Sequence, residues 1–436
     1  MEKRAVTQAL SIECEWSDPI GSPSEVAETT AFLDIRFGDR HATRAENEFS
    51  KTVTNRSLLS AYPFALWLAA SWWRLRWETS PPYMPSNDWR MSHELPAAGG
   101  GFVWPKLVFE SDGESIHLRM APSKPSPFES LHYLEDLHGW VSAIDFEYAV
   151  TTFLNLVCAR LDQRGLRNTQ LQALWSELTA ERSDPALARF RVIEAILGFD
   201  PGDASEDLVD RFLKLNAQAG PAASQEIAHA AAAGSEAERV LTEIVNSVSQ
   251  TSATGKFQVH ASPEIRSLRS AHPWKRGYAL AQRIRETCGL GTRTLDDNAL
   301  AGLLGLQEIV LQDQVPPVSV PAGIAIRGAV RDRFLFRKRW RSGRRFEAAR
   351  MLSDHLLAPD SDSWLLETDT RTARQQAQRA FAAEILCPIA ELEEYLKGDF
   401  SETRIEEAAD HFVVSDFIVR RQLVNNRVPG SGLIRF

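Results

Sequence analysis

Few residues of this chain have the types and spacing that catalysis or metal binding requires. Its 436 residues contain no H-E-x-x-H sequence, in which two histidines on one helical face bind zinc beside a general-base glutamate. The closest fragment, His93-Glu94-Leu95-Pro96-Ala97, lacks the second histidine and carries a helix-breaking proline. The four cysteines form no C-x-x-C pair, and the glycines at 99–101 are not followed by the Lys-Ser/Thr of a phosphate loop. The sequence therefore offers no conventional enzyme motif.

The most unusual charged cluster lies at 327–345. This segment holds nine basic residues, one acid and three interleaved aromatic residues. Arginine beside aromatic residues is typical of contacts with nucleic-acid phosphates and bases, and an acidic protein would also fit. The alternative is that several arginines pair with acids at 347–370 or 384–407. The candidate contact residues are Arg337, Lys338, Arg339, Trp340, Arg341, Arg344 and Arg345, and a strand there would place Arg337, Arg339 and Arg341 on one face.

Two histidine-containing segments are weaker candidates for a metal site. His132 and His138 flank Glu135 and Asp136, but a spacing of six does not place both imidazoles on one helical face. This spacing favours a surface segment over a metal site. His355 lies on the apolar side of its neighbours and is expected to be a core or boundary residue.

Apolar periodicity divides the chain into several parts. Residues 1–141 hold most of the tryptophans and a hairpin pattern over 102–122, which together predict an α+β domain. Residues 142–248 carry repeated amphipathic stripes and predict a helical domain, and the polar segment 249–262 has the composition of a linker. The remaining residues, 263–436, alternate helices with one or two short strands. The expected fold class is α+β and mostly helical.

Three short motifs follow one another in the C-terminal part, namely RRFEAARMLSDHLL, QAQRAFAAEILCP and AADHFVVSDFIVRRQL. In this order they resemble the ImmA/IrrE-type metallopeptidases, whose zinc-binding helix reads RF-x-x-A-H-E-x-x-H. The matching residues are Arg345, Phe346, Ala349, Phe381, Ala382, Ala383, Glu384, Leu386, Pro388, Phe412, Val414, Ser415, Val419 and Leu423. The resemblance covers roughly residues 270–428 and implies a small zincin-like domain.

The residues that would bind zinc in that family are replaced here. In the register of the resemblance, Arg350 stands at the first histidine, Met351 at the catalytic glutamate and Asp354 at the second histidine. Gln375 and Gln376 occupy the third-ligand region. A guanidinium repels a metal ion, methionine cannot act as a base, and a neutral amide is a poor ligand. We therefore expect a pseudo-peptidase without catalytic residues, metal or cofactor.

Three functional hypotheses follow. The first is a non-catalytic regulatory or scaffolding protein that binds a protein partner, in the stress, mobile-element or phage-defence settings that the resemblance implies. The second is an active zinc metallopeptidase with unconventional ligands, for which the candidates are Asp354, His355 and Glu384. The third is a nucleic-acid-binding regulator that uses 327–345 or the C-terminal helices, with Arg420, Arg421 and Arg427 facing outward.

Net charge and hydropathy bound the partners and the location. Lys plus Arg total 49 and Asp plus Glu total 58, so the formal net charge is −9. This acidity argues against a protein that coats nucleic acid with its whole surface. The N-terminal residues lack an apolar signal core, and the most apolar stretch, 62–77, is interrupted by Arg74 and Arg76. We expect a cytoplasmic protein with no membrane partner.

Overall fold

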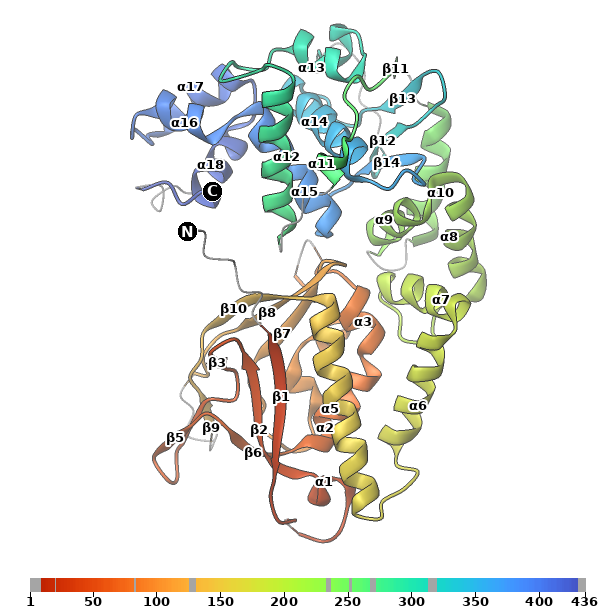
Figure 1. Ribbon diagram of the computed structural model, residues 1–436, viewed down its shortest axis with the longest axis vertical. Helices are drawn as coiled ribbons and strands as arrows, with labels where there is room; N and C mark the ends of the chain where they lie inside the picture. Colours follow the sequence, from red (N-terminus) through yellow and green to blue (C-terminus); the bar gives the residue numbers. More distant parts are fainter. Residues whose placement is uncertain are drawn as a thin grey trace. The chain divides into compact units, whose positions relative to one another are not determined.

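The computed structural model describes residues 9–19, 21–81, 84–124, 131–232, 237–250, 253–266, 272–312 and 320–429. The chain is mixed α and β, about 53% helical, with several small antiparallel sheets. It divides into two compact units, Met1–Asp210 and Arg211–Phe436 (Figure 1). This boundary falls inside the stretch 142–248 that the sequence predicts as one helical domain. None of the described helices is long and apolar enough to cross a membrane.

The first unit contains three small antiparallel sheets. Their strands are β1 (Leu10–Trp16), β2 (Thr30–Phe37), β3 (Arg40–His41) and β6 (Ser57–Ser60) in the first sheet, β4 (Ala45–Asn47), β5 (Thr52–Thr54) and β9 (Leu131–Tyr133) in the second, and β7 (Leu107–Ser111), β8 (Ser115–Met120) and β10 (Leu137–Ser142) in the third. The β7–β8 pair confirms the hairpin predicted over 102–122. Asp112 stabilises its turn, because the carboxylate accepts the backbone N–H groups of Glu114 and Ser115 at 2.9 and 2.7 Å.

Helices pack against these sheets. The helical segments are α1 (Glu25–Glu28), α2 (Ala61–Ala70), α3 (Trp72–Trp77), α4 (Asn87–His93), η1 (Leu95–Ala98), α5 (Ala143–Gln163), α6 (Gln170–Ser183) and α7 (Pro185–Ile196), followed by α8 (Glu206–Ala219), which crosses the unit boundary. The long helix α5 begins where the Ser142 side chain accepts the N–H of Asp145, and it packs against β1 and β10. The predicted helical pattern after 142 is therefore present.

The tryptophans concentrated in the first unit are mainly core residues. Trp67, Trp73 and Trp104 are buried, and their indole N–H groups donate to Met91 O, to the Glu181 carboxylate and to Gly99 O, at 2.8–2.9 Å. A buried indole with a satisfied N–H contributes a large apolar area at no polar penalty. The tryptophan-rich composition therefore has a structural explanation.

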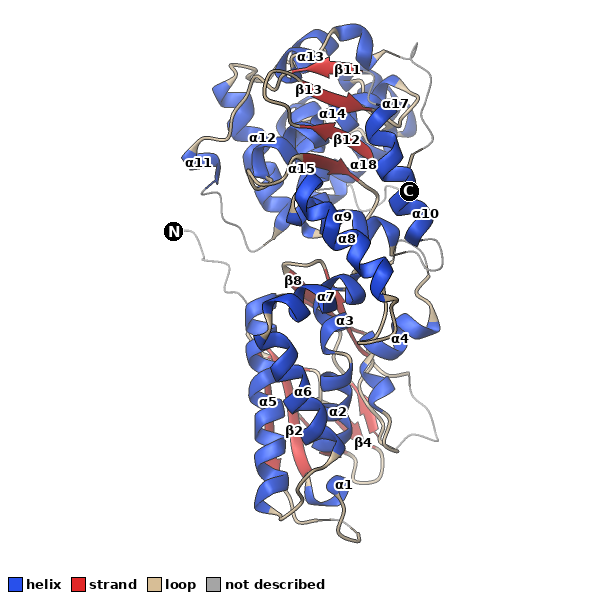
Figure 2. Cartoon of the chain, turned by 90° about the vertical axis from the view of Figure 1, so that its right-hand side faces the viewer, coloured by secondary structure: helices blue, strands red, loops and turns tan. Residues whose placement is uncertain are grey.

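The second unit is built on one four-stranded antiparallel sheet in the order β11-β13-β12-β14, visible edge to edge in Figure 2. The strands are β11 (Ala253–Gly255), β12 (Gly323–Ile326), β13 (Asp332–Leu335) and β14 (Trp364–Glu367). The helical segments are α9 (Pro221–Ala231), α10 (Ala237–Ser247), η2 (Val248–Gln250), α11 (Pro263–Arg266), α12 (Pro273–Thr287), α13 (Asp297–Leu304), η3 (Glu308–Leu311), α14 (Arg341–Leu357), α15 (Ala373–Leu386), α16 (Ile389–Leu396), α17 (Glu402–Phe412) and α18 (Asp416–Asn425).

The segment 249–262 is not a simple linker, because it supplies the edge strand β11. Gly255 of this strand lies so close to the end of α13 that an added Cβ would come within 2.6 Å of Leu304 O. The segment has few apolar side chains, but Phe257 is buried in the core of the unit. The polar composition of 249–262 does not indicate the short strand Ala253–Gly255.

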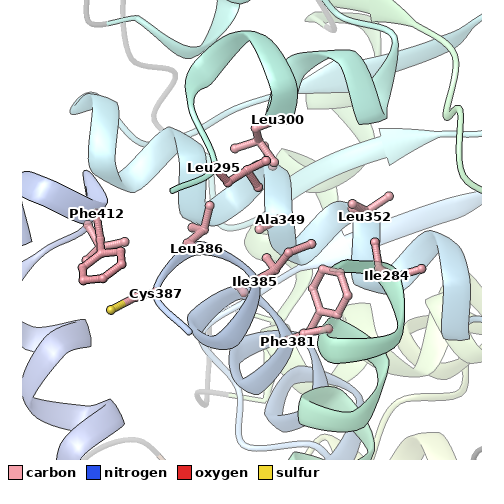
Figure 3. Close-up of a cluster of buried hydrophobic side chains, with 14 of the residues drawn as sticks. Ile284, Leu295, Leu300, Ala349, Leu352, Phe381, Ile385, Leu386, Cys387 and Phe412 are labelled. Atoms are coloured by element: carbon pink, nitrogen blue, oxygen red, sulfur yellow. The ribbon is translucent and has the colours of Figure 1, made fainter. Parts of the chain in front are cut away.

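Helices α12, α14 and α15 pack around a common apolar core. Figure 3 shows Ile284 of α12, Leu352 of α14 and Phe381 of α15 converging, and all three are fully buried. Gly277 allows α12 to approach α15 closely, since an added Cβ would lie 2.1 Å from Ala377 O. This packing fixes α14 and α15, which carry the residues of the candidate site.

Candidate functional site

Arg350 lies in the interior of the second unit, on the third turn of α14. Its guanidinium forms an ion pair with Glu367 at the end of β14 and donates to Thr368 O at 2.6 Å and to the side-chain oxygen of Gln375 on α15. Burial, together with the nearby Arg379 and Arg337 guanidinium groups, lowers the pKa of Arg350 well below its usual value. The position of the expected first zinc ligand is thus occupied by a cation bound from three sides.

Glu367 is the central carboxylate of this cluster and is 1% exposed. Besides Arg350, it accepts Nε and Nη2 of Arg337, each at 2.9 Å. Arg337 also binds Asp369 through two hydrogen bonds of 2.8 and 2.9 Å. Partial burial by itself would raise the pKa of Asp369, but the Arg337 guanidinium outweighs this effect and holds that pKa at about 2. The contacts run from the buried Arg350 on α14 through Glu367 and Arg337 to Asp369, whose carboxylate is exposed at the surface.

Asp354, at the expected second ligand position, is also committed to a structural contact. Its two carboxylate oxygens accept Nε and Nη2 of Arg374 at 2.8 and 2.7 Å, and Oδ2 accepts the N–H of Leu366 at 3.0 Å. Arg374 also binds Asp362 at 2.9 Å. Asp354 therefore fastens α14 to β14 and α15, with no lone pair directed at an open coordination site.

Zinc does not fit these residues. Among the described residues, no group of three or more His, Cys, Asp or Glu side chains could hold a metal ion. Met351, at the expected base position, is 1% exposed and lies against Gly323. A cation, a thioether, a neutral amide and a carboxylate already bound by arginine supply neither the donors nor the base of a zinc peptidase.

The alternative ligands Asp354, His355 and Glu384 do not converge either. His355 stacks on Phe257 with ring centroids 4.0 Å apart, and burial, aided by Arg327, lowers its pKa to about 4. Glu384 accepts the Gln422 amide at 3.1 Å and the N–H of Ile389 at 3.2 Å. Each group has its own neighbours and a structural role.

The basic segment 327–345 is not one continuous strand. β13 ends at Leu335, so Arg337, Arg339 and Arg341 do not share a strand face, because Arg341 already begins α14. Arg337 pairs with Glu347, Glu367 and Asp369, acids within the predicted range 347–370.

The last arginines of the segment are bound to other elements of the same unit. Arg341 and the fully buried Arg345 both pair with Asp297 of α13. Arg344 is 1% exposed and donates to Val310 O at 3.2 Å. Lys338, Arg339 and Trp340 are exposed. Arg337, Arg341, Arg344 and Arg345 are thus bound to other groups of the same unit, although Arg341 is itself exposed.

Two other expectations are corrected by the structure. His132 is buried rather than superficial, because β9 pairs with β4, and its Nε2 lies 3.3 Å from Glu48. Arg420 does not face outward, because it is 8% exposed and pairs with Glu402 and Asp416, whereas Arg421 and Arg427 are exposed as expected. The surroundings of His132 therefore do not support a metal site, and Arg420 is not available on the surface of α18.

A further buried carboxylate escaped the sequence-based argument. Glu226 of α9 accepts the hydroxyl groups of Thr368, Thr370 and Thr372 at 2.8, 2.7 and 2.9 Å. The alternating threonines of TDTRT were the available signal, but their acceptor lies more than 140 positions away. Glu226 thereby joins α9 to the loop that carries Arg350's partner Thr368.

Compared with known proteins, no family model, no curated protein and no solved structure matches this chain.

Proposed function

We propose that the protein is a non-catalytic regulatory or scaffolding protein whose C-terminal unit is a pseudo-peptidase of the ImmA/IrrE type. The observation that carries the proposal is the fully buried guanidinium of Arg350, bound by Glu367, Thr368 O and Gln375 at the position expected for the first zinc ligand. Chemistry at this position would need a metal or a base, and the side chains there supply neither.

A protein partner in the cytoplasm is part of the same proposal, as are the stress, mobile-element or phage-defence settings implied by the resemblance. A domain that keeps a well-packed fold without a reactive centre can act through its surface.

The alternative of a nucleic-acid-binding regulator receives less support. Of the nine basic residues of 327–345, Arg327, Arg337, Arg341, Arg344 and Arg345 donate to carboxylates or carbonyl groups of the same unit. Phosphate binding depends on cations that are available to replace counterions. Too few remain for an extended backbone contact.

Metal analysis of the purified full-length chain tests the proposal. We expect far less than one equivalent of zinc after dialysis against zinc-containing buffer, and no cleavage of an unfolded protein substrate. Stoichiometric zinc in the wild type, lost in Asp354→Ala or His355→Ala but kept in the surface controls Asp410→Ala and His411→Ala, would establish the metallopeptidase alternative. The wild-type measurement is decisive even if a variant misfolds.

A further inference from the structure

One small surface of the second unit combines exposed cations with an exposed tryptophan. Lys338, Arg339 and Trp340 lie between the end of β13 and the start of α14, and Trp340 is 65% exposed. The guanidinium carbon of Arg339 lies 5.1 Å from the centre of the Trp340 ring, a cation–π contact. We call these three residues the Trp340 corner.

The backbone of the Trp340 corner is held in place from the interior. The buried carboxylate of Glu347 accepts the N–H groups of Arg337 and Lys338 at 3.3 and 3.0 Å, and Arg337 is fixed by Glu367. The corner is therefore an ordered surface on a rigid support, which lowers the entropy lost on binding.

The start of α14 does not follow the usual preferences for a helix N-terminus, a feature that it shares with α12. Trp340 occupies the N-cap of α14 and makes no side-chain cap, and the first turn of α14 contains no acidic residue. Helix starts favour Ser, Thr, Asp or Asn and negative charge, so cations and an exposed indole there do not stabilise the helix. Helix capping therefore does not explain the cations and the exposed indole of the corner.

The chemistry of the corner identifies the partner. Tryptophan and arginine are the residue types that contribute most to protein–protein binding energy, and the two cations require negative charge opposite them. A nucleic acid needs a longer row of available cations than Lys338 and Arg339, and the neighbouring exposed Arg341 is already paired with Asp297. We propose that Lys338, Arg339 and Trp340 form a docking site for an acidic segment of a partner protein, an inference that rests on the proposed function and names its contact surface.

Binding of a fluorescein-labelled glutamate-rich peptide to the full-length chain, measured by anisotropy at increasing salt, tests this inference. We expect Arg339→Glu and Trp340→Ala each to weaken binding by about tenfold. The matched control Arg333→Glu makes the same charge change on an exposed arginine of β13 and should change binding by less than about twofold.

Four results would refute the proposed docking site. The first is that the wild type does not bind the peptide at low salt, and the second is that Arg339→Glu and Arg333→Glu weaken peptide binding equally. The third is that the wild type binds a single-stranded oligothymidine more tightly than the peptide and that Arg339→Glu abolishes this binding. The fourth is that the wild type self-associates and that Trp340→Ala disrupts this association, which would identify a second copy of the chain as the occupant. Zinc content is measured separately, so a chain that binds both zinc and the peptide refutes only the proposed function.

Discussion

Replacing Glu367 by glutamine tests whether Arg350 is held as one member of an ion-pair cluster. The Glu367 carboxylate is 1% exposed and accepts Arg350 together with Nε and Nη2 of Arg337. Removing its charge leaves two buried guanidinium groups with less compensation, and breaking a buried pair in this way costs about 3–5 kcal/mol. We expect Glu367→Gln to lower the free energy of unfolding of the second unit by that amount.

Replacing Arg350 by methionine should lower the free energy of unfolding much less than replacing Glu367. In Arg350→Met, Glu367 keeps both bonds from Arg337, Gln375 keeps the N–H of Thr368 at 3.1 Å, and a buried charge is exchanged for an apolar side chain. Because Glu367 stays paired with Arg337 and no buried charge loses its only partner, the loss should stay below about 2 kcal/mol. The double variant should be more stable than the sum of the single effects predicts, with a coupling of about 1–3 kcal/mol.

Urea denaturation of the full-length chain measures these energies, with tryptophan fluorescence as the signal and Trp364 of β14 as a buried reporter. The exposed Arg333→Met serves as control and should change stability by no more than about 0.5 kcal/mol. If Arg350→Met costs as much as Glu367→Gln and the two losses add, Arg350 and Glu367 are not coupled and the interpretation of a guanidinium-centred cluster is refuted.

Three further predictions concern other sites. Val413 has a left-handed φ of 52°, so Val413→Asn should raise the free energy of unfolding by about 1 kcal/mol in urea denaturation. Glu226→Gln, which puts an amide donor among three threonine hydroxyls, should cost about 1–3 kcal/mol and speed hydrogen exchange at the 368–372 loop. Burial, only partly opposed by Arg74, raises the pKa of Glu78 from 4.5 to about 7. The folded state therefore binds the extra proton, and this group's contribution to stability is lost as pH rises from 4.5 to 7, by up to about 3 kcal/mol. Glu78→Gln should gain stability over wild type at pH 8 relative to pH 5 in the same assay.

Local signals in the sequence predicted much of the secondary structure. Ser142 is followed by an amphipathic stripe and caps α5, and Asp184-Pro185 begins α7 with the Asp184 carboxylate accepting two backbone N–H groups. The turn residues between β7 and β8 likewise predicted the hairpin. In each case the determining atoms lie within a few residues of one another, so a single sequence contains the whole interaction.

The candidate site was less predictable because its partners are distant in sequence. The interpretation that basic residues of 327–345 pair internally anticipated the acids bound by Arg337, but Arg341 and Arg345 pair with Asp297, 44 and 48 positions upstream. Nothing in the spacing of charges selects that partner. The packing of α13 against the start of α14 selects it.

The distribution of charge changes what the net value of −9 means. The basic segment is the richest source of positive charge, yet Arg337, Arg341 and Arg345 pair with buried carboxylates, and within this segment the Trp340 corner presents cations beside an exposed aromatic ring. In the proposed pseudo-peptidase, Arg350 supplies its positive charge covalently, so the packing of α14, β14 and α15 does not depend on the concentration of free metal. A metal-bound domain unfolds when its ion is removed, whereas a guanidinium cannot dissociate. A protein that acts by binding gains from this exchange, because its contact surface keeps its shape in every metal condition.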